Sequence, residues 1–256
     1  MKSKRNRAFT YIALLSIAII LFLLYKNYNK NSGVGEMDSN TDTQTDSEVI
    51  EESNDFSFLQ LETENNILTE EGESYKISAT YPKTNIEEID TQIEDLVLKD
   101  IKYFKDQNKE LFNPVSKNIY EFKSELYKTD KYLSFVFNIY EYTGGAHGNI
   151  RIKTLNFNKN KELLDIGSLF IPGTSYLKDI STASRDDLKE RFKDYDPGWI
   201  DEGTEPINQN FEDFYFTEEN TLNIIFEPYT VGPWVIGTPT VGIDLNSGVF
   251  KNIINK

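Results

Sequence analysis

The chain contains a single histidine, His147, in the run 140-YEYTGGAHGN-149, between two glycines and a third. Imidazole is the side chain best suited to proton transfer and to metal binding near neutral pH. A catalytic metal is usually held by several histidine, cysteine or carboxylate side chains, and this chain has one histidine and no cysteine. A Ser-His-Asp triad would lack the strained Gly-x-Ser-x-Gly turn that presents its serine. The sequence therefore predicts no catalytic residue, no metal site and no cofactor.

The glycines around His147 indicate a turn between two strands. Gly144 and Gly145 allow positive φ where the chain reverses, and Gly148 is expected to take a second unusual backbone angle. The imidazole can then hydrogen-bond carbonyl groups that an irregular loop leaves unpaired. Our first interpretation of His147 is structural. The alternative is that His147 and the preceding Tyr142 form part of a binding surface.

A second glycine- and proline-rich run, 227-EPYTVGPWVIG-237, is the other candidate for a surface that binds a partner. Tyr229 and Trp234 supply large amphipathic side chains, and Pro233 stiffens the loop. Trp234 is equally explained as a core aromatic that closes a sheet. Acidic pairs elsewhere in the chain are interpreted as solvated surface. A cell-wall-active hydrolase with a carboxylate-based or histidine-based site remains the alternative function.

Strands and helices that would position these loops follow from the spacing of apolar residues. Alternation with period two predicts strands at 75–81, 119–127, 132–142 and 150–158, with the last three antiparallel in series. Between the first two strands, a helix of about twenty residues is predicted, capped by Thr84 or Asn85. Its apolar stripe consists of Ile86, Ile89, Ile93, Leu96, Val97, Ile101 and Phe104.

The second half of the domain, about 159–256, repeats this arrangement after a first half of about 58–158. Asp165 or Ser168 can cap a turn at 168–170, and a second helix is predicted over roughly 174–193. Strands are predicted at 211–217, 221–229 and 240–245. The fold class that follows is α+β, with two main helices packed on one antiparallel sheet over residues 58–256.

The N-terminal part of the chain predicts a membrane anchor. Residues 8–25 are almost entirely apolar and, as a helix of about 27 Å, nearly match the hydrocarbon thickness of a bilayer. Residues 1–7 are basic and are expected to stay in the cytoplasm, which places the C-terminal domain outside the cell. Residues 26–57, poor in apolar side chains, are predicted to be a disordered acidic linker.

Charge is distributed unevenly, and it argues against nucleic acid as a partner. The chain has a formal net charge of −15. Residues 31–75 carry thirteen acidic and no basic side chains, and residues 76–256 carry 29 acidic and 21 basic ones. Nucleic-acid-binding domains usually present a basic surface, so a cationic partner is the better match.

Three runs resemble a bacterial extracytoplasmic module of unnamed activity: 79-ATYPKTN-85 with its helix, 132-YLSFVFNIYEYTGGAHGN-149, and 214-FYFTEENTLNIIFEPYTVGP-233. The module is found in lysozyme-sensing anti-sigma factors of Firmicutes and in the non-catalytic N-terminal region of peptidoglycan deacetylases. The resemblance covers about residues 60–250. Two features depart from the family pattern. With seven residues ahead of the span, no sigma-binding segment is expected, and Gly232-Pro233-Trp234 stands where a Pro-Tyr-Ala-like run is typical.

The resemblance implies a membrane-anchored module that acts at the cell envelope and performs no chemistry. Its expected partner is a cell-wall component or a cationic wall-directed protein such as lysozyme. Without a sigma-binding segment, binding is expected to sequester lysozyme or to act through another membrane protein.

Overall fold

The computed structural model describes residues 57–108, 116–218 and 220–255, which belong to one compact unit extending over 54–256. The predicted basic tail, membrane span 8–25 and linker, apart from Ser57, lie outside the described residues. Among the helices of the described ranges, none is long and apolar enough to cross a membrane.

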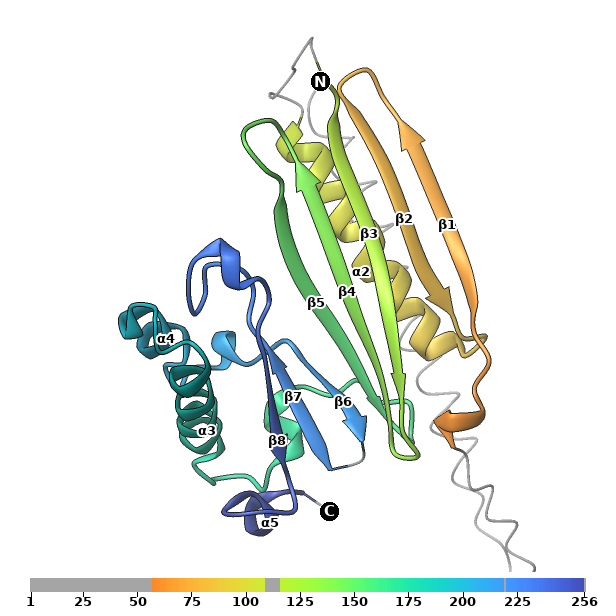
Figure 1. Cartoon of the computed structure of the whole chain (residues 1–256). Helices are drawn as coiled ribbons and strands as arrows, with labels where there is room; N and C mark the ends of the chain where they lie inside the picture. The colour runs from red at the N-terminus through yellow and green to blue at the C-terminus, as the bar shows by residue number, and fades with distance from the viewer. Residues whose placement is uncertain (1–56, 109–115, 219, 256) are drawn as a thin grey trace, which may run out of the picture. The chain divides into compact units, whose positions relative to one another are not determined.

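Five strands form the first sheet, in the order β1-β2-β3-β4-β5 (Figure 1). They are β1 (Glu64–Glu71), β2 (Tyr75–Lys83), β3 (Asn118–Lys128), β4 (Tyr132–Tyr142) and β5 (Asn149–Asn158). The predicted antiparallel series of three strands is confirmed as β3, β4 and β5. The prediction of an entirely antiparallel sheet is wrong at β2 and β3, which are parallel. Parallel neighbours need a crossover connection, and the chain between these strands contains α2 (Glu87–Asn108).

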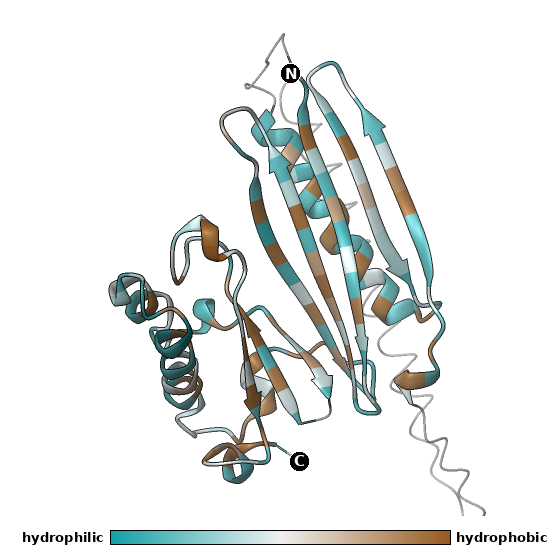
Figure 2. Ribbon diagram, viewed as in Figure 1, coloured by the Kyte–Doolittle hydropathy of each residue, from teal (hydrophilic) through white to brown (hydrophobic). Residues whose placement is uncertain are grey.

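Helix α2 lies along one face of this sheet and buries most of the predicted apolar stripe (Figures 1 and 2). Ile89, Ile93 and Val97 are fully buried, and each such side chain contributes about 1.5–3 kcal/mol when removed from water. The helix begins at Glu87, and the predicted capping residue Thr84 bonds the chain just ahead of it instead of an N–H of the first helical turn. Thr84 Oγ1 accepts a hydrogen bond from the Ile86 N–H at 3.1 Å, and the Asp90 carboxylate accepts from the Thr84 N–H at 2.7 Å.

The second half has its own three-stranded antiparallel sheet, in the order β6-β7-β8, and its own core. Its strands are β6 (Phe214–Glu218), β7 (Thr221–Ile225) and β8 (Thr240–Asp244), and its helices are α3 (Tyr176–Arg191), α4 (Pro197–Gly203) and α5 (Phe250–Ile253). Short 3-10 turns occur at η1 (Phe58–Gln60), η2 (Ile166–Leu169), η3 (Asn208–Asn210) and η4 (Trp234–Ile236). Asp165 caps η2 as predicted, because its side chain accepts from the Ser168 N–H.

An α+β fold is therefore confirmed, but the prediction that both helices pack on one sheet is wrong. Each half has its own sheet, because β6 does not pair with any strand of the first sheet. Instead, side chains of the first sheet bond its backbone: Asn156 Nδ2 donates to the Phe214 carbonyl at 2.8 Å, and the Phe216 N–H donates to Ser134 Oγ at 3.1 Å. The ring of Tyr132 also stacks on that of Phe216, with centroids 3.9 Å apart.

A partly buried ion network fixes α2 to the first sheet at β3, β4 and β5. Arg151 donates two hydrogen bonds to Asp100, at 2.9 and 2.8 Å, and pairs with Glu141. Tyr120 donates a hydrogen bond to Asp100 at 2.7 Å. Burial and the neighbouring Asp100 raise the pKa of the Tyr120 hydroxyl, so it stays protonated and keeps donating.

Candidate functional site

The loop between β4 and β5 has the turn geometry that its glycines predict. Gly144 and Gly145 both have φ of 103°, a backbone region that residues with a Cβ rarely adopt. The space around both glycines is open. The Tyr142 hydroxyl donates a hydrogen bond to the Gly145 carbonyl at 3.0 Å. Tyr142 thus braces the turn that precedes His147.

Gly148 has a different role from the one expected. It is not among the glycines with positive φ, so the expectation of a second unusual angle is wrong. A Cβ at Gly148 would overlap the ring of Tyr140, which packs across the buried glycine. The position requires glycine because of close approach, and the sequence spacing does not distinguish that reason from backbone conformation.

His147 is exposed, and it contacts both its own loop and the other half of the unit. Its Nδ1 lies 2.8 Å from the Gly148 carbonyl, so the expected bond to a loop carbonyl is present. Its ring also stacks on the indole of Trp234, with centroids 4.6 Å apart and planes 18° apart. This contact has no signal in the sequence, since the two residues lie 87 positions apart.

Trp234 is half-buried on the loop between β7 and β8, and Pro233 immediately before it is the N-cap of η4. On the same loop Tyr229 is 48% exposed and holds φ of 70°. Positive φ in a residue with a bulky side chain is strained, and such strain is often found at functional sites. Trp234 therefore is not a fully buried core residue, and the loop presents two aromatic rings at the surface.

Four aromatic rings form one continuous row, here called the aromatic row: His147, Trp234, Tyr229 and Trp199. The Trp234 and Tyr229 centroids are 6.1 Å apart, and the Tyr229 and Trp199 centroids are 6.4 Å apart, within the range of favourable ring pairs. The row begins on the β4–β5 loop, crosses the β7–β8 loop and ends on α4, which combines three separate segments of sequence.

Trp199 is the member of the row that the sequence analysis missed. It lies on α4, whose start is marked by Asp196-Pro197: the Asp196 side chain caps the Gly198 N–H at 2.9 Å, and proline occupies the first helical turn. Those two residues were a usable signal for a short helix. The contact between Trp199 and Tyr229 depends on tertiary packing, and nothing in the sequence predicts it.

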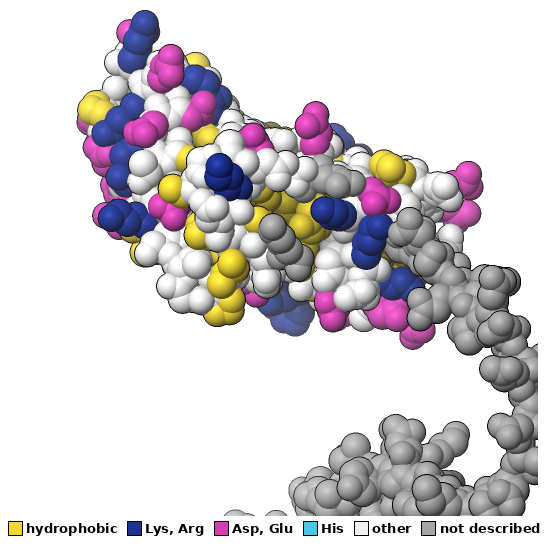
Figure 3. Space-filling view, turned by 90° about the horizontal axis from the view of Figure 1, so that it is seen from below, with side chains coloured by type: hydrophobic (Ala, Val, Ile, Leu, Met, Phe, Trp, Pro, Cys, Tyr) yellow, Lys and Arg dark blue, Asp and Glu magenta, His cyan; other side chains and the backbone are white. Residues whose placement is uncertain are grey.

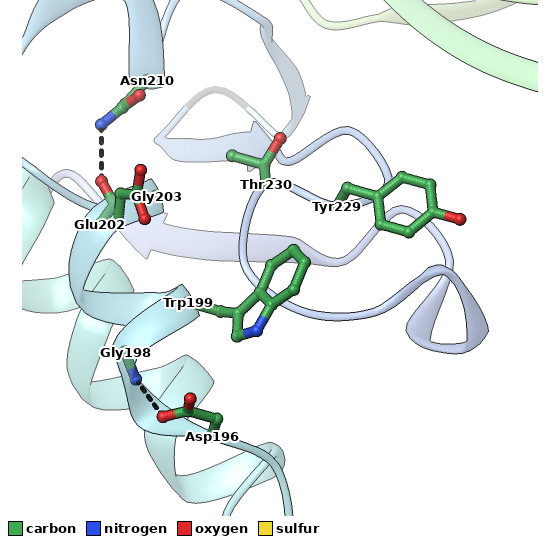
Figure 4. A pocket seen from close by; sticks show the side chains of 8 residues that line it. All are labelled: Asp196, Gly198, Trp199, Glu202, Gly203, Asn210, Tyr229 and Thr230. Atoms are coloured by element: carbon green, nitrogen blue, oxygen red, sulfur yellow. Dashed lines mark hydrogen bonds between the residues drawn. The ribbon is translucent and has the colours of Figure 1, made fainter.

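A pocket of about 590 Å³ opens beside Trp199 and Tyr229 at one end of the row (Figure 4). It is lined by Asp196, Gly198, Trp199, Glu202, Gly203, Asn210, Tyr229 and Thr230. A Cβ at Gly203 would overlap the Thr230 carbonyl oxygen, so this glycine lets α4 approach the β7–β8 loop closely. The pocket wall thus depends on contact between helix and loop.

A smaller cavity of about 90 Å³ adjoins this pocket and shares Asn210 and Thr230 with it. Burial raises the pKa of Asp213 in this cavity to about 6; Lys153 opposes the shift and Glu227 adds to it. The Glu227 carboxylate accepts a hydrogen bond from the Ile152 N–H at 2.7 Å. Within the described ranges, no group of three or more His, Cys, Asp or Glu side chains is placed to hold a metal ion.

Two family models match the chain. Residues 68–150 match the model described as deacetylase PdaC, and residues 167–246 match a protein family of unknown function, DUF3298. The chain therefore has one region similar to each of two families, and these matches support a module shared by RsiV-like and PdaC-like proteins. The aromatic row joins the two matched regions, because His147 lies in the first and Trp199, Tyr229 and Trp234 lie in the second.

Both named relatives come from Bacillus subtilis (strain 168). The chain is 27% identical over 196 residues to peptidoglycan-N-acetylmuramic acid deacetylase PdaC, and the aligned region covers 74% of this chain and 41% of that protein. It is 32% identical over 168 residues to anti-sigma-V factor RsiV, and the aligned region covers 60% of this chain and 57% of that protein. The module therefore spans less than two thirds of either relative.

Solved structures share the fold at low sequence identity. A DUF3298 family protein from Pseudomonas aeruginosa PAO1 aligns with a TM-score of 0.59 and 18% identity, over 76% of this chain and 94% of that one. A member of the same family from Bacteroides fragilis NCTC 9343 aligns with a TM-score of 0.53 and 17% identity, over 78% and 96%.

Proposed function

We propose that this chain is a membrane-anchored, extracytoplasmic binding module of the bacterial cell envelope. It recognises a cell-wall component or a wall-directed protein such as lysozyme, and it performs no chemistry itself. The single observation that carries the proposal is the aromatic row. Exposed tryptophan and tyrosine rings on braced loops are the side chains that contribute most to binding interfaces, because they bury large areas and lose little conformational entropy.

The similarity to PdaC and RsiV supports an envelope location, since one is named a peptidoglycan deacetylase and both match the same module. The apolar run 8–25 supports an anchor that keeps the domain near the membrane. Tyr142, His147, Tyr229, Pro233 and Trp234 are the proposed binding residues, and Trp199 extends the set. Gly144, Gly145 and Gly148 hold the loop in place.

The test is binding by the full chain, purified in mild detergent, to isolated peptidoglycan sacculi and to lysozyme. Lysozyme is titrated at low and at physiological salt, because exposed charges are screened beyond roughly 8 Å at physiological ionic strength. Specific recognition predicts an affinity that persists at physiological salt and falls about tenfold or more in Trp234→Ala. Tyr103→Ala is the matched control, because Tyr103 is an exposed aromatic on α2 and does not belong to the row. Binding that vanishes with salt and ignores Trp234→Ala would reduce the interaction to net charge.

A second candidate function is hydrolysis of the cell wall by a carboxylate pair, and the raised pKa of Asp213 is the observation that favours it. Against it, the cavity of about 90 Å³ is small for a sugar ring, and Glu227 is engaged with a backbone N–H. Release of reducing ends from sacculi by the wild-type chain, abolished in Asp213→Asn, would establish hydrolysis in place of binding alone.

A further inference from the structure

The pocket beside Trp199 has an unusual balance of polar groups. Its charged side chains are the carboxylates of Asp196 and Glu202, and of the described residues that line it none is Lys or Arg. Asn210 uses its amide N–H groups on the carbonyls of Glu202 and Glu205, at 3.3 and 3.0 Å, which leaves its Oδ1 as an acceptor (Figure 4). The lining is therefore rich in acceptors and carries negative charge.

The aromatic walls of the pocket add a second, independent feature. Trp199 is 38% exposed and Tyr229 is 48% exposed, and their ring planes meet at 33°. The faces of such rings attract cations through their quadrupoles, most strongly for tryptophan. The acceptors, the carboxylates and the exposed ring faces all favour the same kind of ligand, a positively charged group that donates several hydrogen bonds.

We propose that this pocket binds the ammonium or guanidinium group of a lysine or arginine side chain on a basic partner protein. The inference rests on the proposed function and specifies which contact selects the partner. Lysine and arginine are donors only, so they satisfy the acceptors of Asp196, Glu202 and Asn210. Covering these carboxylates with a neutral group would leave buried charge unpaired, which is unfavourable.

Charge on a larger scale agrees with a basic protein rather than a neutral glycan. The chain carries −15, and such a field raises the rate at which a basic protein is encountered. On the face of the unit shown in Figure 3, basic and acidic side chains are interspersed. The pocket differs from that face because all of its charged side chains are negative, so it can select a cation at close range.

The experiment uses the full chain in detergent and a hexalysine peptide as the probe, titrated by calorimetry at physiological salt. Two pocket variants are measured: Glu202→Gln, which removes one exposed carboxylate, and Trp199→Leu, which removes the ring without changing charge. Their matched controls are Glu205→Gln and Tyr195→Leu, which change an exposed acid and an exposed tyrosine outside the lining. Circular dichroism verifies the fold of each variant, and Glu202→Gln keeps the test valid if Trp199→Leu unfolds.

Each pocket variant is expected to weaken hexalysine binding about fivefold or more, and each control less than about twofold. Hexalysine acetylated on every side-chain amine should not bind. Equal binding by the acetylated peptide, or equal effects in pocket and control variants, would overturn the proposal. A glucosamine hexamer that binds more tightly than hexalysine and responds to the same variants would also overturn it, by assigning the pocket to an amino sugar.

Failure of this proposal is distinguishable from failure of the proposed function. If Trp234→Ala loses binding to lysozyme or sacculi while Glu202→Gln and Trp199→Leu keep it, the binding surface stands without its Trp199 end and the cation pocket falls. If the wild-type chain binds neither lysozyme nor sacculi, yet binds hexalysine through the pocket, the envelope partner falls and the pocket stands.

Discussion

Replacing Asp213 by asparagine should stabilise the protein above pH 6 and should remove part of its pH dependence. Asp213 is 13% exposed, and burial raises the pKa of its carboxyl from 3.8 to about 6. The two pKa values differ by about two, and each unit of difference corresponds to 1.36 kcal/mol, so ionised Asp213 destabilises the folded state by about 3 kcal/mol. Asparagine has nearly the same shape, cannot ionise, and can still accept a hydrogen bond from the Thr154 backbone through its Oδ1.

The direction follows from proton binding. Between about pH 4 and pH 6 the folded state keeps a proton on Asp213 that the unfolded chain has released, so the free energy of unfolding contributed by this group falls as pH rises. Above about pH 7 the loss is complete and constant. The free energy of unfolding of Asp213→Asn minus that of wild type should therefore rise from about 1 kcal/mol at pH 4.5 to about 2–3 kcal/mol at pH 7.5. Lys153, which loses an ion-pair partner 3.7 Å away, reduces the gain.

The assay is urea unfolding followed by far-ultraviolet circular dichroism, at intervals from pH 4.5 to pH 7.5. Glu212→Gln is the matched control, because Glu212 is adjacent, carries the same charge, also approaches Lys153 and is 59% exposed. Its effect should stay within about 0.5 kcal/mol over the whole range. A difference for Asp213→Asn that is flat with pH, or that shrinks as pH rises, would refute the reasoning from burial.

Three further substitutions test the loops. His147→Ala should lower the free energy of unfolding by less than about 1 kcal/mol, because the ring is exposed and loses one stack and one carbonyl contact. A larger loss in thermal unfolding would show that these two contacts hold the loop more strongly than the exposure of the ring implies. Gly148→Ala should lower the free energy of unfolding by about 1–3 kcal/mol, since its Cβ would overlap the Tyr140 ring. In a chain that already carries Tyr140→Ala, the same substitution should cost much less. An equal cost in both chains, measured by urea unfolding, would exclude that clash as the cause. Gly203→Ala should also cost about 1–3 kcal/mol by pushing α4 away from the Thr230 carbonyl, and an unchanged melting temperature would contradict the close contact.

Local patterns predicted most of the elements. The stripe from Ile86 to Phe104 indicated α2, and alternation indicated β2 to β5, because burial of one face selects apolar residues at regular spacing; β4 is buried on both faces over its first half. The exposed strand β1 was missed, since nearly all of its residues face solvent and leave no alternation to detect. The predicted strand 221–229 ends at Ile225, because the segment from Phe226 to Tyr229 belongs to the loop of the row.

The candidate site was only partly predictable, for the same physical reason. Glycine and proline content marked both loops, and Tyr229 and Trp234 were recognisable as large amphipathic side chains. The pairing of His147 with Trp234 depends on how the two halves pack, and the pairing of Tyr229 with Trp199 depends on how α4 packs against the β7–β8 loop. Neither periodicity nor turn chemistry specifies that packing. The separation into two sheets was unpredictable on the same grounds, because the alternation in β6 does not specify its neighbour.

The chain has two tryptophans, and both Trp199 and Trp234 belong to the aromatic row. Intrinsic indole emission, excited at wavelengths that tyrosine does not absorb, therefore originates entirely from this surface. It reports the environment of the row while remaining insensitive to the interior of either sheet. A spectral change on adding a partner would locate the partner at the row without any attached label. Comparison of Trp199→Leu with Trp234→Ala would then assign the change to the pocket end or to the His147 end.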